Sequence, residues 1–509
     1  MTPLHEHRTV LCHIAIIFLM GSFSLATEFD GGTGEPNDPY QIATAEQLIT
    51  IGSDPSLLDK HFILINDIDL DPNLPGGRVF TRALIAPDAN EALGFQSTEF
   101  AGDFDGNSRK IANLIIDGNT VGYVGLFGGV GQKGKIHDLN LQNVSVRGSS
   151  HVGWLVGCNL GTISDCQVSA RISSDTRALF LGALVGRNEG ALANCQARGV
   201  VSGGDYSAYL GGLAGCNGFA QGGASIVSCH AVGLVTGGQE CVALGGLAGA
   251  NKRTITDSDA GGLVSSGDKC WDIGGLVGWN RGEISGSHAS ALMIAGTDSI
   301  RIGGLVGCMG LPRPSAPKEI ESVSQGRITA CYASGSVCSG DRSSEVGGLV
   351  GLSWGWIQSC YATGSVCAGE DANGLGGLVG VNGGVPVLDS YARGSVWGGD
   401  RSRNLGGLVG ENGHRFSEVV HCYAAGSVAA AKDADGLGGL VAANAGWVDG
   451  YYLAALDGGG PENGMGVPLL DEQIRQQASF IRWDFDKIWM ICEGRDYPHL
   501  QWERINCTK

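Results

Sequence analysis

A six-residue phrase recurs along this chain: an apolar residue, two glycines, a leucine, a valine or alanine, and a closing glycine. It is complete at seven places and looser at four more, and its central leucines are Leu126, Leu155, Leu184, Leu213, Leu247, Leu276, Leu305, Leu349, Leu378, Leu408 and Leu440. Six of the ten intervals between these leucines are 29 residues. A fixed period of this length predicts a solenoid, in which each repeat adds one coil to a stack.

A small residue lies 18 positions before each of the last nine leucines. This column is Cys166, Cys195, Cys229, Ser258, Ser287, Cys331, Cys360, Ser390 and Cys422. The intervals from a leucine to the next small residue vary, and the two largest insertions, 218–224 and 309–325, fall in them. The pattern predicts a core of fixed length whose insertions project from one edge.

Around the small residue the pattern alternates with a period of two, as in a half-buried strand. Over 360–366 one face carries Cys, Ala, Gly and Val, and the other carries Tyr, Thr and Ser. The glycine phrase predicts a second strand where backbones approach closely. Two or three short strands per repeat predict an all-β, right-handed parallel β-helix of about eleven coils. An asparagine follows most phrases, where it tolerates a left-handed backbone and bonds its own turn, and stacked copies also predict an internal ladder of amides.

The two flanks differ from the repeats and predict caps, which a solenoid needs because its end coils expose unpaired strands. We assign 27–120 to an N-terminal cap and the first coils, 121–455 to the repeats and 456–509 to a C-terminal cap. Thr44 and Gln47 form a capping-box pattern that opens a short helix through Ile51. An amphipathic pattern predicts a second helix over 470–481.

The repeats resemble the GLUG motif, named for its Gly-Leu-apolar-Gly core, over residues 124–452. The segments at 31–34, 38–42 and 44–48, and those at 483–485, 488–489, 493–494 and 497–498, resemble the two ends of such proteins. Residues 104–107 resemble the opening coil of right-handed β-helices. GLUG repeats occur in exported bacterial proteins, including adhesin-like ones and the non-catalytic parts of some IgA-cleaving metallopeptidases. The resemblance implies an exported surface protein.

Residues 1–26 have the pattern of a secretory signal peptide: a basic Arg8, a short apolar run and a small-residue cleavage site at 24–26. We therefore expect a secreted or cell-surface protein, with no transmembrane span after the signal is removed. The formal net charge is −18, which argues against nucleic acid as a partner.

Outward-facing tyrosines follow the small residue in the later coils: Tyr332, Tyr361, Tyr391 and Tyr423, with Tyr452 expected in the same register. A flat aromatic strip is a candidate platform for sugar rings, and the alternative is ordinary packing between neighbouring strands. The strip makes extracellular glycans, or protein ligands, the candidate partners.

The turn eight residues before the central leucine is often acidic, and Asp341, Glu370 and Asp400 occupy it in consecutive coils. Stacked carboxylates repel one another, so this column is a candidate Ca²⁺ site. The alternative is that these side chains only serve the turn. No other cofactor is expected.

The inward column of cysteines is better explained by packing than by metal binding, because serine replaces cysteine in it three times. Cys241 with Cys270, and Cys338 with Cys367, lie one coil apart, within the Cα range of a disulfide. Cys492 and Cys507, in the C-terminal cap, are a further candidate pair.

Motifs of catalysis are missing from the sequence: there is no His-Glu-x-x-His, Gly-x-Ser-x-Gly or phosphate-binding loop. The leading hypothesis is an exported, non-catalytic surface protein of the adhesin type that contacts glycans or other cell-surface partners. The alternative is a carbohydrate-active β-helix enzyme, which would need acidic and basic residues gathered on one sheet face.

Overall fold

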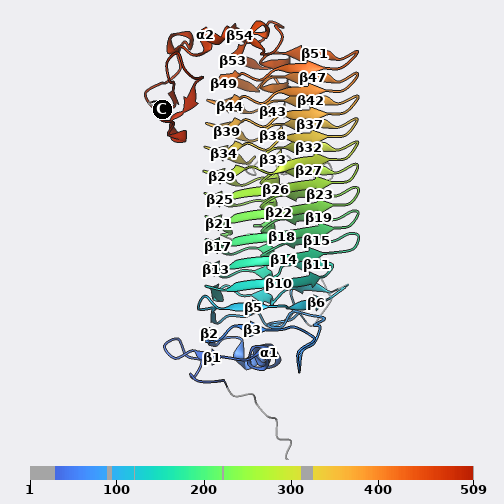
Figure 1. The fold of residues 1–509 in the computed structure, drawn as a ribbon, viewed down its shortest axis with the longest axis vertical. Helices are drawn as coiled ribbons and strands as arrows, with labels where there is room; N and C mark the ends of the chain where they lie inside the picture. The colour runs from blue at the N-terminus through green and yellow to red at the C-terminus, as the bar shows by residue number, and fades with distance from the viewer. Residues whose placement is uncertain (1–28, 89–93, 120, 221–222, 311–324, 508–509) are drawn as a thin grey trace, which may run out of the picture.

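The structure is a computed structural model that describes residues 29–88, 94–119, 121–220, 223–310 and 325–507. The predicted signal peptide and most of the 309–325 insertion lie outside these residues. The chain forms a parallel β-helix whose coils stack into a rod, as Figure 1 shows, and two of its sheets have eleven strands each. The prediction of an all-β parallel solenoid of about eleven coils is confirmed. Among the described residues, no helix has the length and apolarity that crossing a membrane requires.

Each coil has four strand positions rather than the two or three expected. The first two are β9 (Lys135–His137) and β10 (Asn140–Arg147), β13 (Thr162–Ser164) and β14 (Gln167–Ser173), β17 (Ala191–Ala193) and β18 (Gln196–Gly203), β21 (Ser225–Val227) and β22 (His230–Gly237), and β25 (Thr254–Thr256) and β26 (Asp259–Ser266). In later coils the second position is divided: β29 (Glu283–Ser285) with β30 (His288–Ala289) and β31 (Leu292–Ala295), β34 (Arg327–Thr329) with β35 (Tyr332–Ala333) and β36 (Val337–Ser339), β39 (Trp356–Gln358) with β40 (Tyr361–Ala362) and β41 (Val366–Ala368), β44 (Pro386–Leu388) with β45 (Tyr391–Ala392) and β46 (Val396–Gly398), then β49 (Glu418–Ala424), β50 (Val428–Ala430) and β53 (Trp447–Leu453).

The third strand position forms what we call the β19 ladder. Its members are β7 (Gly122–Val124), β11 (Ser150–Val152), β15 (Leu179–Gly182), β19 (Ala208–Gly211), β23 (Val242–Gly245), β27 (Trp271–Gly274), β32 (Ile300–Gly303), β37 (Ser344–Gly347), β42 (Asn373–Gly376), β47 (Arg403–Gly406) and β51 (Asp435–Gly438). The fourth position forms the β20 ladder: β8 (Phe127–Val130), β12 (Val156–Asn159), β16 (Val185–Asn188), β20 (Ala214–Asn217), β24 (Ala248–Asn251), β28 (Val277–Asn280), β33 (Val306–Met309), β38 (Val350–Ser353), β43 (Val379–Asn382), β48 (Val409–Asn412) and β52 (Val441–Asn444).

Left-handed residues explain the extra strand breaks. In the coil that begins with β17, Asn194 (φ 53°) separates β17 from β18 and comes directly before the inward Cys195. Tyr206 (φ 61°) lies in the next turn, and Tyr209 (φ 64°) redirects β19. Asp, Asn and Ser often hold the first of these positions in other coils, and they accept this backbone region more readily than most residues do.

The repeated glycine phrase is a close-approach device, as predicted. A Cβ atom at Gly211 would lie 2.0 Å from the Ala214 carbonyl oxygen, and one at Gly212 would lie 2.0 Å from the Gly246 carbonyl oxygen of the next coil. Side chains do not fit at either place. The central Leu213 and the inward Cys195 are fully buried.

The asparagines that follow the phrase form the predicted internal ladder of amides. Asn159 donates from Nδ2 to Oδ1 of Asn188 at 2.8 Å, and Asn188 donates in the same way to Asn217, also at 2.8 Å. These side chains are fully buried, so each amide satisfies the next one inside the core. None of the three is left-handed, but two of them also bind their own turns: the Gly161 N–H donates to Asn159 Oδ1 at 3.1 Å, and Asn188 donates from Nδ2 to the Gly190 carbonyl at 3.0 Å.

Length variation falls on one edge, as expected. The 218–224 insertion joins the end of β20 to the start of β21 in the next coil, and the 309–325 insertion likewise lies between β33 and β34.

The N-terminal cap contains the predicted helix, α1 (Ala45–Ser53), together with β1 (Tyr40–Ile42), β2 (His61–Leu64), β3 (Ile68–Asp69), β4 (Asp103–Asp105), β5 (Lys110–Ala112), β6 (Ile115–Asp117) and a 3₁₀ turn at Pro55–Leu57. The Thr44 and Gln47 capping box is present in full. The helix starts the stack on which the first coils build.

The C-terminal cap differs from the prediction of one helix over 470–481. Only α2 (Asp471–Ile474) is helical, followed by a 3₁₀ turn at Gln477–Ser479, and the other elements are β54 (Val467–Leu469), the hairpin of β55 (Trp489–Met490) and β56 (His499–Leu500), and 3₁₀ turns at Ala455–Asp457 and Gln501–Glu503. The helix ends because Gly494 donates its N–H to the Arg475 carbonyl, and Gln477 donates its N–H to the Glu493 carboxylate. Backbone groups that a longer helix would use are thus bound to a neighbouring segment.

Candidate functional site

The predicted tyrosine strip exists, but its rings stack on one another rather than lying flat. The tyrosine column, which we define as Tyr332, Tyr361, Tyr391 and Tyr423, has centroid distances of 4.9 Å between successive rings and interplanar angles of 7–10°. The spacing between neighbouring coils is close to the centroid separation of two stacked aromatic rings. Each ring therefore covers the face of its neighbour. The rings therefore do not form the flat face that was expected, and glycan binding by this column stays a prediction.

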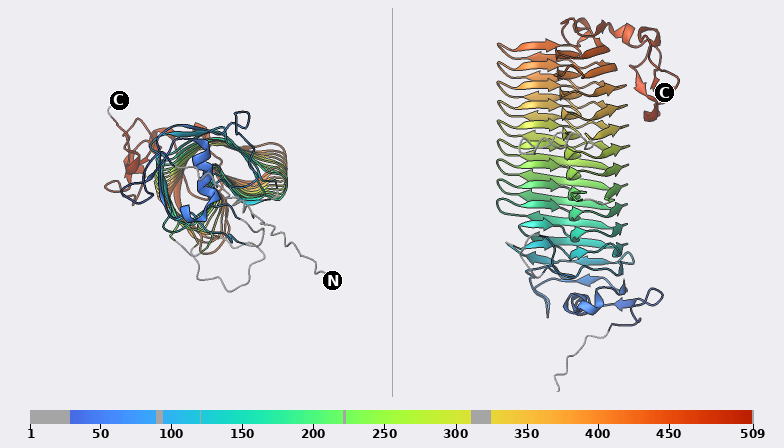
Figure 2. Two further views of the ribbon diagram at one scale, coloured as in Figure 1. Left: turned by 90° about the horizontal axis from the view of Figure 1, so that it is seen from below. Right: turned by 180° about the vertical axis from the view of Figure 1, so that it is seen from behind.

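The C-terminal cap covers the upper part of the tyrosine column. Figures 1 and 2 show the cap lying beside the last coils instead of only closing their end. Tyr391 and Tyr423 are 1% and 0% exposed, which contradicts the expectation that they face solvent. The Tyr423 hydroxyl donates to the Pro498 carbonyl at 2.6 Å, and the Tyr391 hydroxyl donates to the Glu503 carboxylate at 3.0 Å.

Two further contacts hold the cap to the same column. Arg393 donates from Nε to the Tyr423 hydroxyl at 2.9 Å and from Nη2 to the Pro498 carbonyl at 3.1 Å. Trp502 stacks 5.6 Å from the Tyr361 ring and donates to the Ser359 carbonyl at 3.0 Å. The column is therefore mainly a docking surface for the chain's own cap.

Register decides which tyrosine continues the column. Tyr423 pairs with Tyr451, and not with Tyr452 as expected, because a bulge between Val420 and Cys422 shifts the alignment of β49 with β53. Tyr452 consequently points into the main core, where it is 1% exposed.

The acidic turn column is bound to protein groups. The Asp341 carboxylate accepts the Glu370 N–H of the next coil at 2.9 Å, and the Asp400 carboxylate accepts the Lys432 N–H at 3.0 Å. Glu370 is paired with Arg401 at 2.9 Å. These contacts match the turn role that was the alternative. Calcium binding by Asp341, Glu370 and Asp400 stays a prediction, which thermal melts in EDTA and in excess calcium would test.

Cysteine pairing follows the predicted positions in two of three cases. Cys492 and Cys507 form a disulfide within the C-terminal cap, and Cys338 and Cys367 form one between neighbouring coils. Cys241 and Cys270 are buried free thiols.

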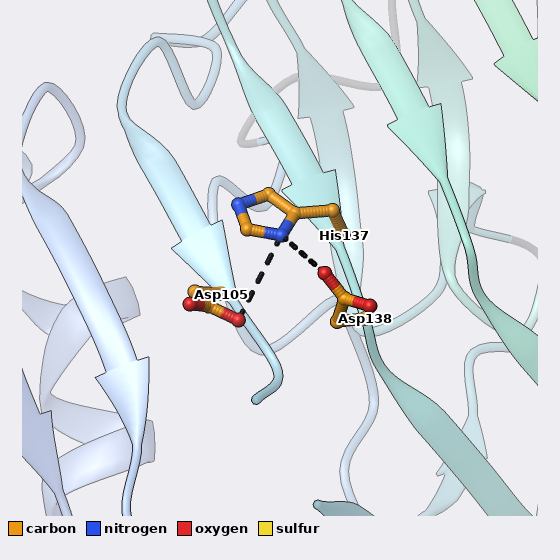
Figure 3. A group of neighbouring side chains, drawn as sticks. All are labelled: Asp105, His137 and Asp138. Carbon is orange, nitrogen blue, oxygen red and sulfur yellow. Dashed lines mark hydrogen bonds and ion pairs between the residues drawn. The ribbon is translucent and has the colours of Figure 1, made fainter. Parts of the chain in front are cut away.

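A histidine among carboxylates lies near the N-terminal end of the rod (Figure 3). His137 Nδ1 lies 2.9 Å from Asp138 and 3.7 Å from Asp105, while its Nε2 lies 3.0 Å from Asp103. Burial opposes charging of the ring, but the Asp138 hydrogen bond and the Asp105 and Asp103 charges outweigh it and raise the pKa of His137.. A raised pKa favours the ion pair, and the ligand atoms of Asp105, His137 and Asp138 also lie within 4.8 Å of one another, close enough to hold a metal ion.

A second row of rings, which the sequence analysis missed, lies on the outer side of the β19 and β20 ladders. Tyr123, His151, Phe180 and Tyr209 stack at 4.2, 4.8 and 4.9 Å, one ring per coil. All four belong to the β19 ladder, and Phe180 and Tyr209 pack against residues of the β20 ladder in an apolar cluster separate from the main core. We call this line of contact the seam. Its signal was present in the sequence as an aromatic residue directly before the apolar residue of four successive phrases.

The seam is hollowed near its N-terminal end. A hollow of about 510 Å³ is lined by side chains that include Tyr123, Cys158, Arg187 and Glu189. Arg187 Nε lies 2.7 Å from Glu189, whose carboxylate also accepts the Phe219 N–H at 2.8 Å. The ion pair thus fixes one wall of the hollow by joining a strand of the β20 ladder to the loop after β20.

Burial shifts the pKa values of titratable groups around the hollow, and it raises that of the Glu99 carboxyl. Burial lowers the pKa of His151 to about 3, so the ring is neutral and serves packing. Burial also raises the pKa of the Cys158 thiol to about 12, so it is not a thiolate at neutral pH. The hollow thus offers aromatic edges, one guanidinium, two carboxyl groups and a shaped wall from which a ligand site can be built.

Comparisons with known proteins find partial sequence matches and assign no family. No family model matches it. It is 34% identical over 149 residues to "Halomucin" of Haloquadratum walsbyi, covering 29% of this chain and 2% of that protein. It is 34% identical over 146 residues to a "Putative Gly-rich membrane protein" of Evansella cellulosilytica, covering 28% of this chain and 15% of that protein. The chain thus matches only a small part of each curated relative's length.

Among solved structures, the chain aligns with a putative immunoglobulin A1 protease from Bacteroides ovatus. The alignment covers 93% of this chain and 95% of that one, at 16% identity and a TM-score of 0.24. A likeness of this strength carries no argument about function.

Proposed function

We propose that this chain is an exported, non-catalytic cell-surface protein of the adhesin type, built on GLUG-like repeats, that binds glycans at the seam. The observation that carries the proposal is the hollow beside Tyr123 and Arg187, because concave sites with a few fixed polar groups are the usual places for ligands. The likeness to halomucin and to a Gly-rich membrane protein supports a surface location. The resemblance of the repeats to those of exported bacterial proteins supports the same location.

Binding to immobilised glycans and to intact cells tests the proposal. We expect Tyr123→Ala to weaken glycan binding, because the ring forms part of the hollow's wall. Tyr206→Ala is the matched control, since that ring is 50% exposed in a turn outside the hollow. Equal loss in both variants, or no glycan or cell bound by the unaltered chain, would contradict the proposed site. Cleavage of a polysaccharide by the purified protein would favour the alternative, a carbohydrate-active enzyme.

A further inference from the structure

Positively charged side chains gather on the seam of a protein whose formal net charge is −18. Arg187 projects from β16, and Lys252 and Arg281 come directly after β24 and β28. Asn251 pairs with Asn280 in the β20 ladder, so Lys252 and Arg281 occupy the same position in adjacent coils. Three coil steps separate the strand of Arg187 from that of Arg281, about 14 Å at the usual strand spacing.

Most of this positive charge lacks a carboxylate partner among the residues that the structure describes. Arg187 is neutralised by Glu189, but no ion pair within 4.0 Å joins Lys252 or Arg281 to an acidic side chain in that part of the chain. The Nε atom of Arg281 is buried and has no hydrogen-bond partner there. Burial lowers the pKa of Lys252, and the nearby charges of Arg281 and Arg187 lower it further, partly offset by Cys216 and Glu189.

Aromatic rings hold these cations at the surface of the seam. Lys252 Nζ lies 3.9 Å from the centroid of Phe219 and 5.4 Å from that of Trp279. The Arg281 guanidinium carbon lies 5.9 Å from the Trp279 ring, and that of Arg187 lies 5.5 Å from the Phe219 ring. Such contacts orient the cations but leave their charge uncompensated. An anion placed here would gain charge-assisted hydrogen bonds in a partly desolvated site.

We infer that Lys252 and Arg281, together with the Arg187 end of the hollow, bind the carboxylate or sulfate groups of an acidic polysaccharide. The row of cations along the rod matches a linear polymer that carries an anionic group at intervals. The rings of Phe219 and Trp279 offer apolar contact beside them, which sugar rings use. This inference rests on the proposed function and names its ligand class.

Binding of defined polymers to the full chain tests the inference. The probes are polygalacturonate for carboxylates, chondroitin sulfate for sulfates, dextran as a neutral polymer and a single-stranded DNA oligonucleotide as a different polyanion. We expect one or both acidic polysaccharides to bind, with affinity falling as salt rises, and dextran and DNA to bind more weakly. The acidic polymer that binds more tightly identifies which oxyanion, carboxylate or sulfate, the site prefers.

Paired variants locate the site. The double variant Lys252→Ala and Arg281→Ala should weaken binding of the acidic polymer by about tenfold or more, since charge-assisted hydrogen bonds are lost. The double variant Arg171→Ala and Arg198→Ala is the matched control, because it removes the same charge from exposed positions on β14 and β18. Lys252→Gln removes the charge, keeps most of the length of the side chain and serves if the alanine variant melts at a lower temperature.

Different failures have different meanings. Equal weakening by both double variants, or equal binding of DNA and acidic polysaccharide, would show a general charge effect and overturn the inference. Dextran binding that is insensitive to Lys252→Gln would overturn it while leaving the proposed glycan-binding function standing. If the chain still binds cells but binds no glycan, both the proposed glycan-binding function and the inferred acidic polysaccharide ligand are contradicted.

Discussion

The tyrosine column and the ring row of the seam are built alike but have different fates. Both place one aromatic ring per coil, and both stack those rings at 4.2–4.9 Å. The C-terminal cap lies over Tyr391 and Tyr423, which are 1% and 0% exposed, whereas in the seam Tyr123 and Phe180 keep 8% each and Tyr209 is only half-buried. Stacking is thus a consequence of the coil spacing. Whether a row of rings packs inside the protein or can contact a ligand depends on which segment covers the ring edges.

The largest effect should come from truncating a covered ring. Tyr423→Ala removes a fully buried side chain and leaves Arg393 and the Pro498 carbonyl without their hydroxyl partner. We expect it to lower the free energy that holds the cap by about 3–5 kcal/mol. Tyr209→Ala, on the partly exposed ring, should cost clearly less. Hydrogen exchange of amides in 483–503 measures the first effect.

Tyr423→Phe separates the ring from its hydroxyl. It keeps the stacked ring and should cost about 1–3 kcal/mol, because Arg393 Nε and the Pro498 carbonyl each lose their hydrogen bond to the Tyr423 hydroxyl. Tyr332→Phe, in the column but with a partly exposed side chain, should be close to neutral. An equal loss of cap protection in Tyr332→Phe and Tyr423→Phe would contradict the distinction between covered and open rings.

An effect of similar size should follow from opening the cap's disulfide. Cys492→Ser with Cys507→Ser frees a loop with a sequence separation of 15 residues, which should cost the cap about 3 kcal/mol. The coils contact mainly their neighbours, so the seam should be unchanged. Limited proteolysis would show faster cleavage in the cap alone. Cys338→Ser with Cys367→Ser is the control, since that pair joins two coils of the rod.

The repeat made the coil predictable because its constraints are local and periodic. Each recurring feature of the repeat contacts the neighbouring coil, so one repeat predicts the next. This holds for the glycines at 211 and 212, the inward Cys195 and the stacked asparagines. The extra strand break at Asn194 was not predicted, although the recurrence of Asp, Asn and Ser before the small residue carries that information.

The site was much less predictable because it depends on contacts distant in sequence. The sequence placed Tyr391 and Tyr423 correctly on an outward face, but only the fold brings Pro498 and Glu503 over them. Periodicity reports which way a side chain points and is silent about what non-repeating segment covers it. The cations of the seam were missed for a related reason, since Arg187, Lys252 and Arg281 hold no single register of the repeat.

The smallest effect, and the finest test of the comparison, is the ionisation of the tyrosines. Burial raises the pKa values of Tyr391 and Tyr423 above the ordinary value of about 10. The folded state therefore keeps protons that the unfolded state releases. The stabilising contribution is fully present below about pH 10 and is lost as pH rises through the folded pKa values. We expect the cap to loosen at alkaline pH before the coils do, which hydrogen exchange and an ultraviolet absorbance titration would record together.

The seam supplies an internal control for that titration. Burial also raises the pKa of Tyr123, but no part of the C-terminal cap lines its hollow. In the Cys492→Ser and Cys507→Ser variant, the late-titrating class should lose the covered tyrosines and keep Tyr123. If all the tyrosines that ionise late still do so after the cap is opened, the raised pKa values of Tyr391 and Tyr423 come from stacking within the column. The cap would then not be what separates the two rows of rings.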